Sequence, residues 1–447
     1  MVIHPVLMIA VPLLAAFLTP LLKRVAKQFT FAILVLNSIF SVLLLAKVYN
    51  DGMVYETIAG FSPPIGIYLA VDSLSALLAF VINVFATINF ITSDGDHRFS
   101  MLYLLAVTGS TGIVLTGDIF NMFVFFEITA VASYALVAAK RDRGAIEGAI
   151  KYMILGSVGS VFILMGIAII YSQLKSLNIY DIASRISSMD TKMMWISFSL
   201  LLTGIGVEAE IFPLNGWVPD AYEGAKSNIA SFLSFGPSKA AIYAIARLLM
   251  VVFPYNNAYE IALYVGVATL VVGEIAAMMQ ENTKRMLAYS SIGQMGLILI
   301  AFSLASQHFE YALLAAFFLV VSHASAKSAL FLLSKSDGMP GVVGKYTGVV
   351  AVLSIIGMPP FAGFWGKWYL LLGAAGQKLW FVIILVFFSG IVEAVYFARY
   401  LNRNYGRKGK LPISYKYAMV ILATLSLIFG LITLLNSMAM QNMLGGV

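Results

Sequence analysis

Long runs of hydrophobic residues, separated by short polar segments, are the main pattern along the chain. Each run is close to the roughly 20 residues that a helix needs to cross the hydrocarbon core of a bilayer. None shows the alternation of a membrane barrel strand. The pattern therefore predicts fourteen membrane-spanning helices. They cover residues 5–22, 30–48, 69–92, 100–116, 119–139, 149–172, 193–211, 228–253, 259–280, 286–306, 309–334, 344–374, 378–398 and 417–441.

Proline and glycine interrupt three of these runs. The sequence FPLNGW (212–217) ends the seventh, GP (236–237) divides the eighth, and GMPPFAGFWGKWY (357–369) divides the twelfth. A broken helix frees backbone carbonyls and amides, which are tolerated at membrane depth only inside protein or beside a water-filled cavity. The breaks therefore predict where water enters the bundle.

The second half of the chain repeats sequence features of the first half. FPLNGW and MPPFAGFW share the order Pro, Gly, Trp, and KAAIYAIAR (239–247) is similar to EAVYFAR (393–399). A repeat in which spans 4–8 correspond to spans 9–13 would explain both, and its five helices would invert the second copy. We expect one membrane domain over residues 1–447. Its predicted parts are N-terminal helices at 1–99, half channels at 100–253 and 259–398, and a loop with a last helix at 399–447.

The composition agrees with a membrane protein. Hydrophobic residues make up 61% of the 447 residues and charged residues 11%, and the mean hydropathy is +0.92. A soluble domain carries roughly 25% charged residues. The predicted fold class is an all-α polytopic membrane protein with discontinuous helices 7 and 12. Its longest connections, 175–192 and 399–416, leave no room for a soluble catalytic domain.

Several classes of chemistry are absent from the sequence. The chain has no cysteine, which excludes disulfides, iron–sulfur ligation and thiolate chemistry within it. Its four histidines are scattered and form no metal-ligand pattern, and no glycine-rich segment forms a phosphate-binding loop. We therefore expect no cofactor, no metal and no redox chemistry in this chain. Energy for transport must come from other proteins.

The basic residues predict the orientation in the membrane. They concentrate in loops that follow odd-numbered spans, such as those of Lys140 and Lys335, whereas loops after even-numbered spans hold few, including Lys192. Lys and Arg in short loops stay on the cytoplasmic side. We expect a multi-pass protein of the cytoplasmic membrane with both termini on the external side. The net charge of +7 then reflects topology and not a nucleic-acid partner.

Many charged residues fall inside the predicted spans. Each costs about 2.5 to 3.5 kcal/mol at the middle of a bilayer. A chain with so many is expected to hold them for ion conduction, for pairing, or for both. They are Glu127, Lys151, Glu208, Glu210, Lys239, Arg247, Glu274, Lys327, Lys367 and Glu393.

Five sequence blocks carry a resemblance to a known family. They are GIYLAVDSLS (66–75), GDIFNMFVFFEITAVASYALVA (117–138), FPLNGWVPDAY (212–222), ENTKRMLAYSSIGQMG (281–296) and GMPPFAGFWGKW (357–368). In this order and spacing they resemble the antiporter-like, proton-conducting membrane subunits shared by complex I, Mrp-type sodium/proton antiporters and membrane-bound hydrogenases. The resemblance covers nearly the whole chain.

In that family a glutamate on span 5 and lysines on spans 7, 8 and 12 form a row of buried ionisable groups. Glu127 matches the glutamate, Lys239 the lysine on span 8, and Lys367 the position on span 12. His323 and Lys327 match the His-x-x-x-Lys positions of span 11. The resemblance implies that these five residues carry protons across the plane of the membrane.

Structural roles are open for some of the same residues. Lys239 follows the break at 236–237 and could cap freed carbonyls, and His323 with Lys327 could serve packing and hydrogen bonding. Only the internal repeat points to a role for Glu393, so an ion pair and a proton relay are both open. Lys151 and Glu147 have i, i+4 spacing, which favours a solvated ion pair.

The chain departs from the family at Glu208. Members usually carry lysine there, five residues before the proline of the FPL motif. The first half channel would then hold Glu127 opposite Glu208, and two carboxylates in one low-dielectric site do not both ionise without compensation. Glu208 is open to three interpretations: a proton carrier, a cation ligand together with Glu127, or the mark of a silent half channel. Glu210, two residues on, would point elsewhere on a continuous helix, and Glu274 has no predicted role.

The sequence therefore predicts an ion-translocating subunit of a multi-subunit membrane redox complex. Protons, with sodium as a second candidate ion, would pass from Glu127 and Glu208 through Lys239, His323 and Lys327 to Lys367 and Glu393. The expected partners are other membrane subunits, including a homologous antiporter-like or a small hydrophobic subunit, and the lipid bilayer. A subunit of an Mrp-type Na⁺/H⁺ antiporter and a stand-alone secondary transporter are the alternatives.

Overall fold

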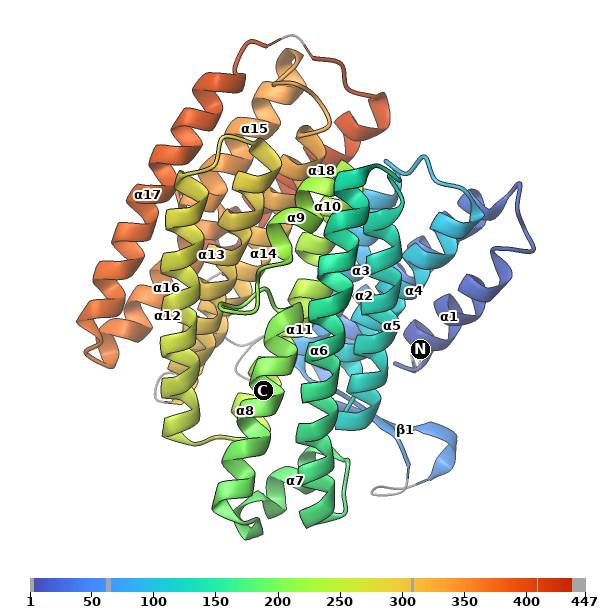
Figure 1. Cartoon of the computed structure of the whole chain (residues 1–447), viewed down its shortest axis with the longest axis vertical. Coiled ribbons are helices and arrows are strands. Elements are labelled where there is room, and N and C mark those ends of the chain that lie inside the picture. Colours follow the sequence, from blue (N-terminus) through green and yellow to red (C-terminus); the bar gives the residue numbers. More distant parts are fainter. Residues whose placement is uncertain (1–3, 62–65, 307–308, 408, 436–447) are drawn as a thin grey trace.

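The computed structural model describes residues 4–61, 66–306, 309–407 and 409–435 as a bundle of α-helices (Figure 1). Within these residues, eleven helical segments are long and apolar enough to cross a membrane. They are α2 (Ala26–Asp51), α3 (Ser73–Phe90), α4 (His97–Leu115), α5 (Ile119–Ala138), α6 (Arg143–Leu174), the continuous stretch Ser227–Val252, α12 (Asn256–Met278), α13 (Thr283–Ser303), α14 (Phe309–Leu333), α17 (Trp380–Asn404) and α18 (Ile413–Leu435). The chain is thus a polytopic helical membrane protein. The predicted end of the last span, at 441, lies outside the described residues.

Shorter helices lie where the sequence carries its breaks. α8 (Thr191–Glu208) stops before the FPLNGW segment and the short α9 (Val218–Gly224) follows it. The stretch Ser227–Val252 consists of α10 (Ser227–Phe235), α11 (Pro237–Arg247) and the π-helical turn η3 (Leu248–Val252). α15 (Gly341–Ile356) and α16 (Ala362–Gly376) flank the break in the twelfth run. The remaining short elements are α1 (Leu7–Leu18), α7 (Ile179–Arg185) and the 3₁₀ turns η1 (Ile58–Gly60), η2 (Ile186–Ser188) and η4 (Leu304–Ser306).

One predicted span begins too early. Residues 69–71 belong to strand β2 (Tyr68–Val71), which pairs antiparallel with β1 (Val54–Thr57), and not to a helix. The helix begins after Asp72, whose carboxylate accepts a hydrogen bond from the Ser75 backbone amide at 2.7 Å. Arg247 holds the hairpin against the bundle, because its guanidinium donates to the backbone oxygens of Ala70 and Thr116, each at 2.7 Å. Figure 1 shows β1 and α7 at the same end of the molecule.

Aspartate and asparagine side chains start many of the helices. At the starts of α4 and α6, Asp96 and Asp142 accept hydrogen bonds from backbone amides of the first turn. The Phe99 amide lowers the pKa of Asp96, and the Lys140 side chain, together with the Ala145 amide, lowers the pKa of Asp142. These caps fix where each helix leaves the loop.

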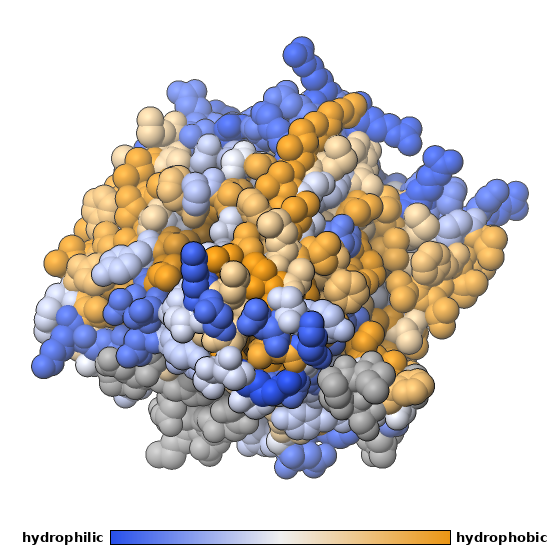
Figure 2. All heavy atoms as spheres, turned by 60° about the horizontal axis from the view of Figure 1, so that its bottom comes forward, coloured by the Kyte–Doolittle hydropathy of each residue, from blue (hydrophilic) through white to orange (hydrophobic). Residues whose placement is uncertain are grey.

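The helices differ in how deeply they lie in the bundle. Every residue in the most apolar stretch of α14 is buried, whereas only 39% of the corresponding stretch of α17 is. Large apolar side chains such as Ile384 and Ile391 on α17, and Ile154 and Val161 on α6, are exposed. Figure 2 shows a broad apolar surface with hydrophilic residues gathered toward the ends of the view. α14 is therefore central, and α6 and α17 face lipid or neighbouring subunits.

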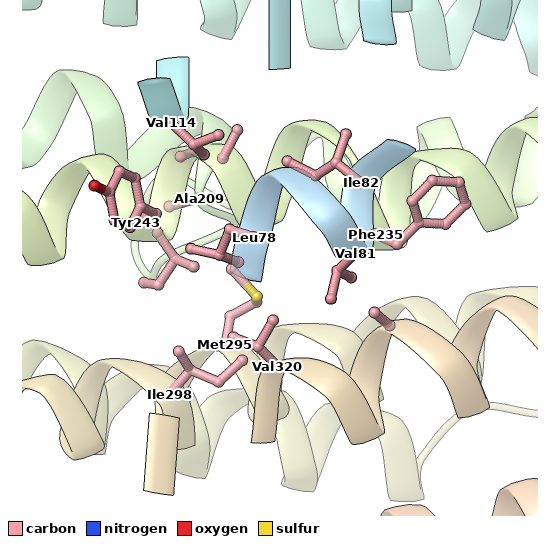
Figure 3. Close-up of a cluster of buried hydrophobic side chains, with 14 of the residues drawn as sticks. Leu78, Val81, Ile82, Val114, Ala209, Phe235, Tyr243, Met295, Ile298 and Val320 are labelled. Carbon is pink, nitrogen blue, oxygen red and sulfur yellow. The ribbon is translucent and has the colours of Figure 1, made fainter. Parts of the chain in front are cut away.

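An apolar cluster joins the two halves of the chain. In Figure 3, Leu78 and Val81 of α3 lie opposite Met295 and Ile298 of α13, with Val320 of α14 beside them. All five side chains are buried. The charged residues of the site described next lie around a core that excludes water.

Candidate ion-translocation site

Glu208 occupies the last position of α8 and is buried, with 6% of its surface exposed. The Tyr152 hydroxyl of α6 donates to its Oε2 at 2.7 Å. Its Oε1 has no hydrogen-bond partner among the described residues. The half-buried Glu127 of α5 accepts a hydrogen bond from Ser160 and interacts electrostatically with Glu208. The structure therefore brings the two predicted carboxylates into one cluster.

Aromatic side chains build the walls of this cluster. The Tyr152 ring stacks on Trp217, with 3.5 Å between centroids and 2° between planes, and the Trp217 indole donates to the Val207 oxygen at 3.0 Å. Trp217 thus links the segment after the break to the end of α8 and holds the Tyr152 hydroxyl toward Glu208. Gly156 leaves room here, since a Cβ atom on it would lie 1.8 Å from the Tyr134 hydroxyl oxygen.

Lys239 lies at the start of α11 and is fully buried. Its Nζ lies 3.2 Å from the Ser238 Oγ and 3.1 Å from the Met295 Sδ. Both are weak substitutes for water as partners of an ammonium group. Glu210 is the carboxylate that interacts with it electrostatically. The hypothesis that Lys239 caps freed carbonyls has no support in these contacts.

Glu210 is the first residue that sequence reasoning left without a role. Its carboxylate is 1% exposed, and its Oε1 accepts a hydrogen bond from the Tyr222 hydroxyl at 2.5 Å. It interacts electrostatically with both Lys239 and Lys327. Because α8 has already ended and Glu210 has a positive φ of 62°, the spacing of a continuous helix does not apply. The signal was the FPL break itself, which follows within three residues.

His323 and Lys327 lie on α14 at the centre of the bundle. Both are at most 1% exposed. The Lys327 Nζ donates to the Leu287 backbone oxygen at 3.1 Å and lies 5.4 Å from the centre of the Phe397 ring. His323 interacts electrostatically with Lys239 and Lys327 and so lies between the two lysines in the row of charges.

Lys367 and Glu393 form an ion pair between α16 and α17. Glu393 is fully buried and also accepts a hydrogen bond from Gln294 of α13. The Lys367 Nζ donates in addition to the Ile356 backbone oxygen at 3.1 Å, which is the last carbonyl of α15. The break between α15 and α16 frees that carbonyl, and Lys367 satisfies it. The two predicted residues therefore meet at the break between α15 and α16.

Glu274 of α12 completes the set and is the second residue without a predicted role. It is 1% exposed and interacts electrostatically with Lys327, Lys367 and Glu393. Its sequence context gave no signal, because no break or family block adjoins it.

These residues form a row in which each member interacts electrostatically with the next. In order they are Glu127, Glu208, Glu210, Lys239, His323, Lys327, Glu274, Glu393 and Lys367. Three carboxylates begin the row, and lysines and carboxylates lie next to each other further along it, so opposite charges there compensate part of the cost of burial. Among the described residues, no group of three His, Asp or Glu side chains could hold a metal ion.

A bundle of membrane helices with breaks beside buried lysines and carboxylates defines an antiporter-like membrane protein. A sequence profile described as "NADH:quinone oxidoreductase/Mrp antiporter, TM" matches residues 116–341 and 343–392. The chain belongs to this family of antiporter-like membrane subunits.

Comparison with individual members gives the same result. The chain is 31% identical to NADH-quinone oxidoreductase subunit N of Desulforudis audaxviator over 90% of this chain and 86% of that protein. It is 26% identical to a Na⁺/H⁺ antiporter protein of Bacillus subtilis over 95% of this chain and 93% of that protein. A chain in the structure of the membrane-bound sulfane sulfur reductase, an archaeal respiratory membrane complex, superimposes with a TM-score of 0.90. The two are 31% identical over 99% of this chain and 97% of the other.

Proposed function

We propose that this chain is the proton-translocating subunit of a multi-subunit membrane redox complex of the complex I, membrane-bound hydrogenase or sulfur-reducing type. The observation that carries the proposal is the unbroken row of buried charged residues from Glu127 to Lys367. The likeness to the sulfane sulfur reductase chain supports this kind of complex. Energy has to come from redox subunits, because this chain has no cysteine for an iron–sulfur cluster.

In this proposal two half channels exchange protons with opposite sides of the membrane. Glu127 and Glu208 load the first, Lys239 with His323 and Lys327 passes protons laterally, and Lys367 with Glu393 unloads the second. Buried amines and carboxylates serve this task because desolvation and neighbouring charges bring their proton affinities closer together. A proton can then move to the next group without a large rise in free energy.

The proposal includes fourteen spans arranged as two inverted five-helix repeats. The charges support the internal symmetry. Glu210 lies between α8 and the FPLNGW break and interacts with Lys239 of α11, whereas Lys367 follows the break after α15 and pairs with Glu393 of α17. Each half thus has a pair of opposite charges beside a helix break, with the signs exchanged.

The contacts of Glu208 support the proton-carrier interpretation over a cation site. A hydroxyl group donates to each carboxylate of the first cluster, from Tyr152 to Glu208 and from Ser160 to Glu127. In the part of the chain that the structure describes, no group of three His, Asp or Glu side chains could hold a metal ion, so a cation here would lack further carboxylate ligands. A silent half channel would have no need for a buried carboxylate that costs about 2.5 to 3.5 kcal/mol.

Transport by the reconstituted complex tests the proposal. We expect that Glu127→Gln and Lys367→Ala each abolish most proton uptake into proteoliposomes when the redox reaction is started. The control is Glu147→Gln, because Glu147 forms a half-exposed ion pair with Lys151 outside the row. Normal proton uptake in both Glu127→Gln and Lys367→Ala would refute the proposal.

The Mrp-type antiporter is the alternative that a specific observation favours, since 95% of this chain matches the Bacillus subtilis antiporter protein. Purification of the native complex separates the two. Iron–sulfur and other redox subunits should accompany this chain in our proposal. Co-purification with small hydrophobic subunits alone, together with Na⁺-driven proton movement, would establish the alternative.

A further inference from the structure

Glu274 is a buried carboxylate that no motif or known role explains. It lies on α12, one turn before the helix ends at Met278. Both of its oxygens are buried, and neither has a hydrogen bond of good geometry among the described residues, although the Tyr396 hydroxyl lies within reach. A carboxylate in such a place is costly unless it carries a proton or exchanges one.

The helices make room for this side chain. A Cβ atom on Gly293 of α13 would lie only 2.3 Å from the Glu274 Oε1, so any larger residue there would displace the carboxylate. Ser290 lies one turn before Gly293 and Gln294 directly follows it, and both form hydrogen bonds with residues of α17. The absence of a side chain at Gly293 therefore directs Glu274 toward the contact between α13 and α17.

Two groups of α17 lie beside the carboxylate. Glu393, the partner of Lys367, interacts with Glu274 electrostatically, as do Lys367 itself and Lys327. The Tyr396 hydroxyl also lies close enough to interact with it, although its hydrogen bond of 2.6 Å is to the Ser290 hydroxyl. Glu274 thus adjoins both the ion pair of the second half channel and a pair of hydroxyl groups.

Tyr396 connects this region to the surface. It is 1% exposed and is one of the residues that line a small cleft where α12 ends, α13 begins and α17 ends. The polar residues of this cleft include Glu281, Arg399 and Arg403. Arg399 and Arg403 donate to the backbone oxygens of Met278 and Glu281 and so stay at the cleft. Water in the cleft would contact Tyr396.

We propose that Glu274 is a proton-exchanging residue that connects this cleft to the Lys367–Glu393 pair. The Tyr396 hydroxyl accepts a proton from water in the cleft and gives its own proton to the Glu274 carboxylate, which becomes a carboxylic acid. Glu274 then transfers the proton to the Glu393 carboxylate, which neutralises Glu393 and frees the Lys367 ammonium group to release its own proton. The inference rests on the proposed function, because it assigns an access route to the second half channel.

Transport by the complex with Glu274→Gln is the first test. Proton uptake into proteoliposomes should fall by about tenfold, equivalent to about 1.4 kcal/mol of barrier. Glu274→Asp should retain more activity than Glu274→Gln, because it keeps an exchangeable carboxyl group. The matched control is Glu260→Gln, an exposed residue near the start of the same helix, which should leave transport unchanged.

Infrared difference spectra provide a readout that a structural role would not change. A carboxylic acid in an apolar site gives a carbonyl band that appears or disappears when the complex turns over. We expect one such band to be absent in Glu274→Gln and present in Glu260→Gln. An unchanged spectrum together with normal transport in Glu274→Gln would overturn the inference.

A second variant covers the case in which Glu274→Gln does not assemble. Tyr396→Phe removes only the hydroxyl group and should also slow proton uptake, because the path to the cleft is then interrupted. Normal uptake in Tyr396→Phe would refute the route. These failures remain distinct from failure of the proposed function, which requires normal transport in Lys367→Ala and Glu127→Gln.

Discussion

At the scale of single residues, the surroundings of Glu208 accommodate a carboxylate at the position where the resemblance to the family implies a lysine. The Tyr152 hydroxyl donates to its Oε2. Gly156 keeps the space beside the Glu208 Oε1 free, since its own Cβ would lie 3.3 Å from that atom. The substitution is therefore accommodated by its neighbours, as expected of a working site.

Glu208→Gln tests this interpretation. The amide keeps the shape of the side chain and can still accept from Tyr152, but it cannot exchange a proton. Transport by the reconstituted complex should fall by about tenfold, equivalent to about 1.4 kcal/mol of barrier, while assembly stays normal. Tyr152→Phe is the companion variant and should have a smaller effect, because the carboxyl group remains. Unchanged proton uptake in Glu208→Gln would mean that the first half channel is silent.

Sequence reasoning could propose roles only for residues at fixed distances from motif residues. Glu127, Lys239 and Lys367 are of this kind, and each lies in the row of charges. Glu210 and Glu274 could not be assigned in this way. The direction of Glu210 depends on where α8 ends, and that of Glu274 depends on Gly293 of another helix. Sequence spacing encodes neither.

At the scale of elements, the helix breaks need anchors, because α9 has only seven residues and too few hydrogen bonds to be stable alone. Asp220 of α9 supplies two of these anchors. Its carboxylate pairs with Lys151 of α6 at 2.6 Å and with Arg285 of α13 at 2.5 Å. The ion pair that the sequence predicted between Lys151 and Glu147 is present at 2.8 Å and extends to Asp220.

Asp220→Asn should loosen α9 from its neighbours. The loss of two partly exposed ion pairs is expected to cost about 1 kcal/mol, because solvent and salt screen pairs of this kind. Protease accessibility and hydrogen exchange of residues 212–224 should both increase. Glu147→Gln, which removes a more exposed partner of the same lysine, should change them little. Equal protection of this segment in Asp220→Asn and the unmodified protein would contradict the anchoring role.

Close contact between α12 and α13 positions Glu274. A Cβ atom on Gly273 would lie 2.3 Å from the backbone nitrogen of Gly293, so Gly273→Ala must push the helices apart. We expect a loss of about 1 to 3 kcal/mol, typical of overpacking, and a lower thermal stability of the purified complex. Gly390→Ala on α17 is the control, because nothing lies within 4 Å of its Cβ position. Equal unfolding temperatures for the two variants would show that the helices are not packed this tightly.

The sequence predicted the breaks better than it predicted the hairpin. Proline and glycine act locally, so the segments at 212–217 and 357–361 interrupt helices wherever the chain places them. Strand β2 consists of apolar residues directly before a helix, which looks like the helix itself. It becomes a strand because β1 and Arg247 satisfy its backbone groups, and both of these contacts are tertiary.

At the scale of the whole molecule, the outer helices present apolar side chains outward and the charged row lies largely inside the bundle. α14 holds His323 and Lys327 at the centre, whereas α6 and α17 expose isoleucine, valine and phenylalanine side chains. Glu393 belongs to α17 but is fully buried. Such a row is most useful if its two ends open to opposite sides of the membrane, and the orientation of the chain decides which end opens to which side.

The absence of cysteine allows a direct test of that orientation. Lys335 and Lys192 are both exposed and lie in loops predicted on opposite sides. In intact cells or right-side-out vesicles, a membrane-impermeant maleimide should label Lys192→Cys, and it should label Lys335→Cys only after the membrane is opened. A permeant maleimide should label both and so controls for reactivity, and the unmodified protein should label with neither. The positive-inside rule predicts this result because loops rich in Lys and Arg are retained in the cytoplasm. The reverse pattern would place both termini in the cytoplasm and reverse the side to which each half channel opens.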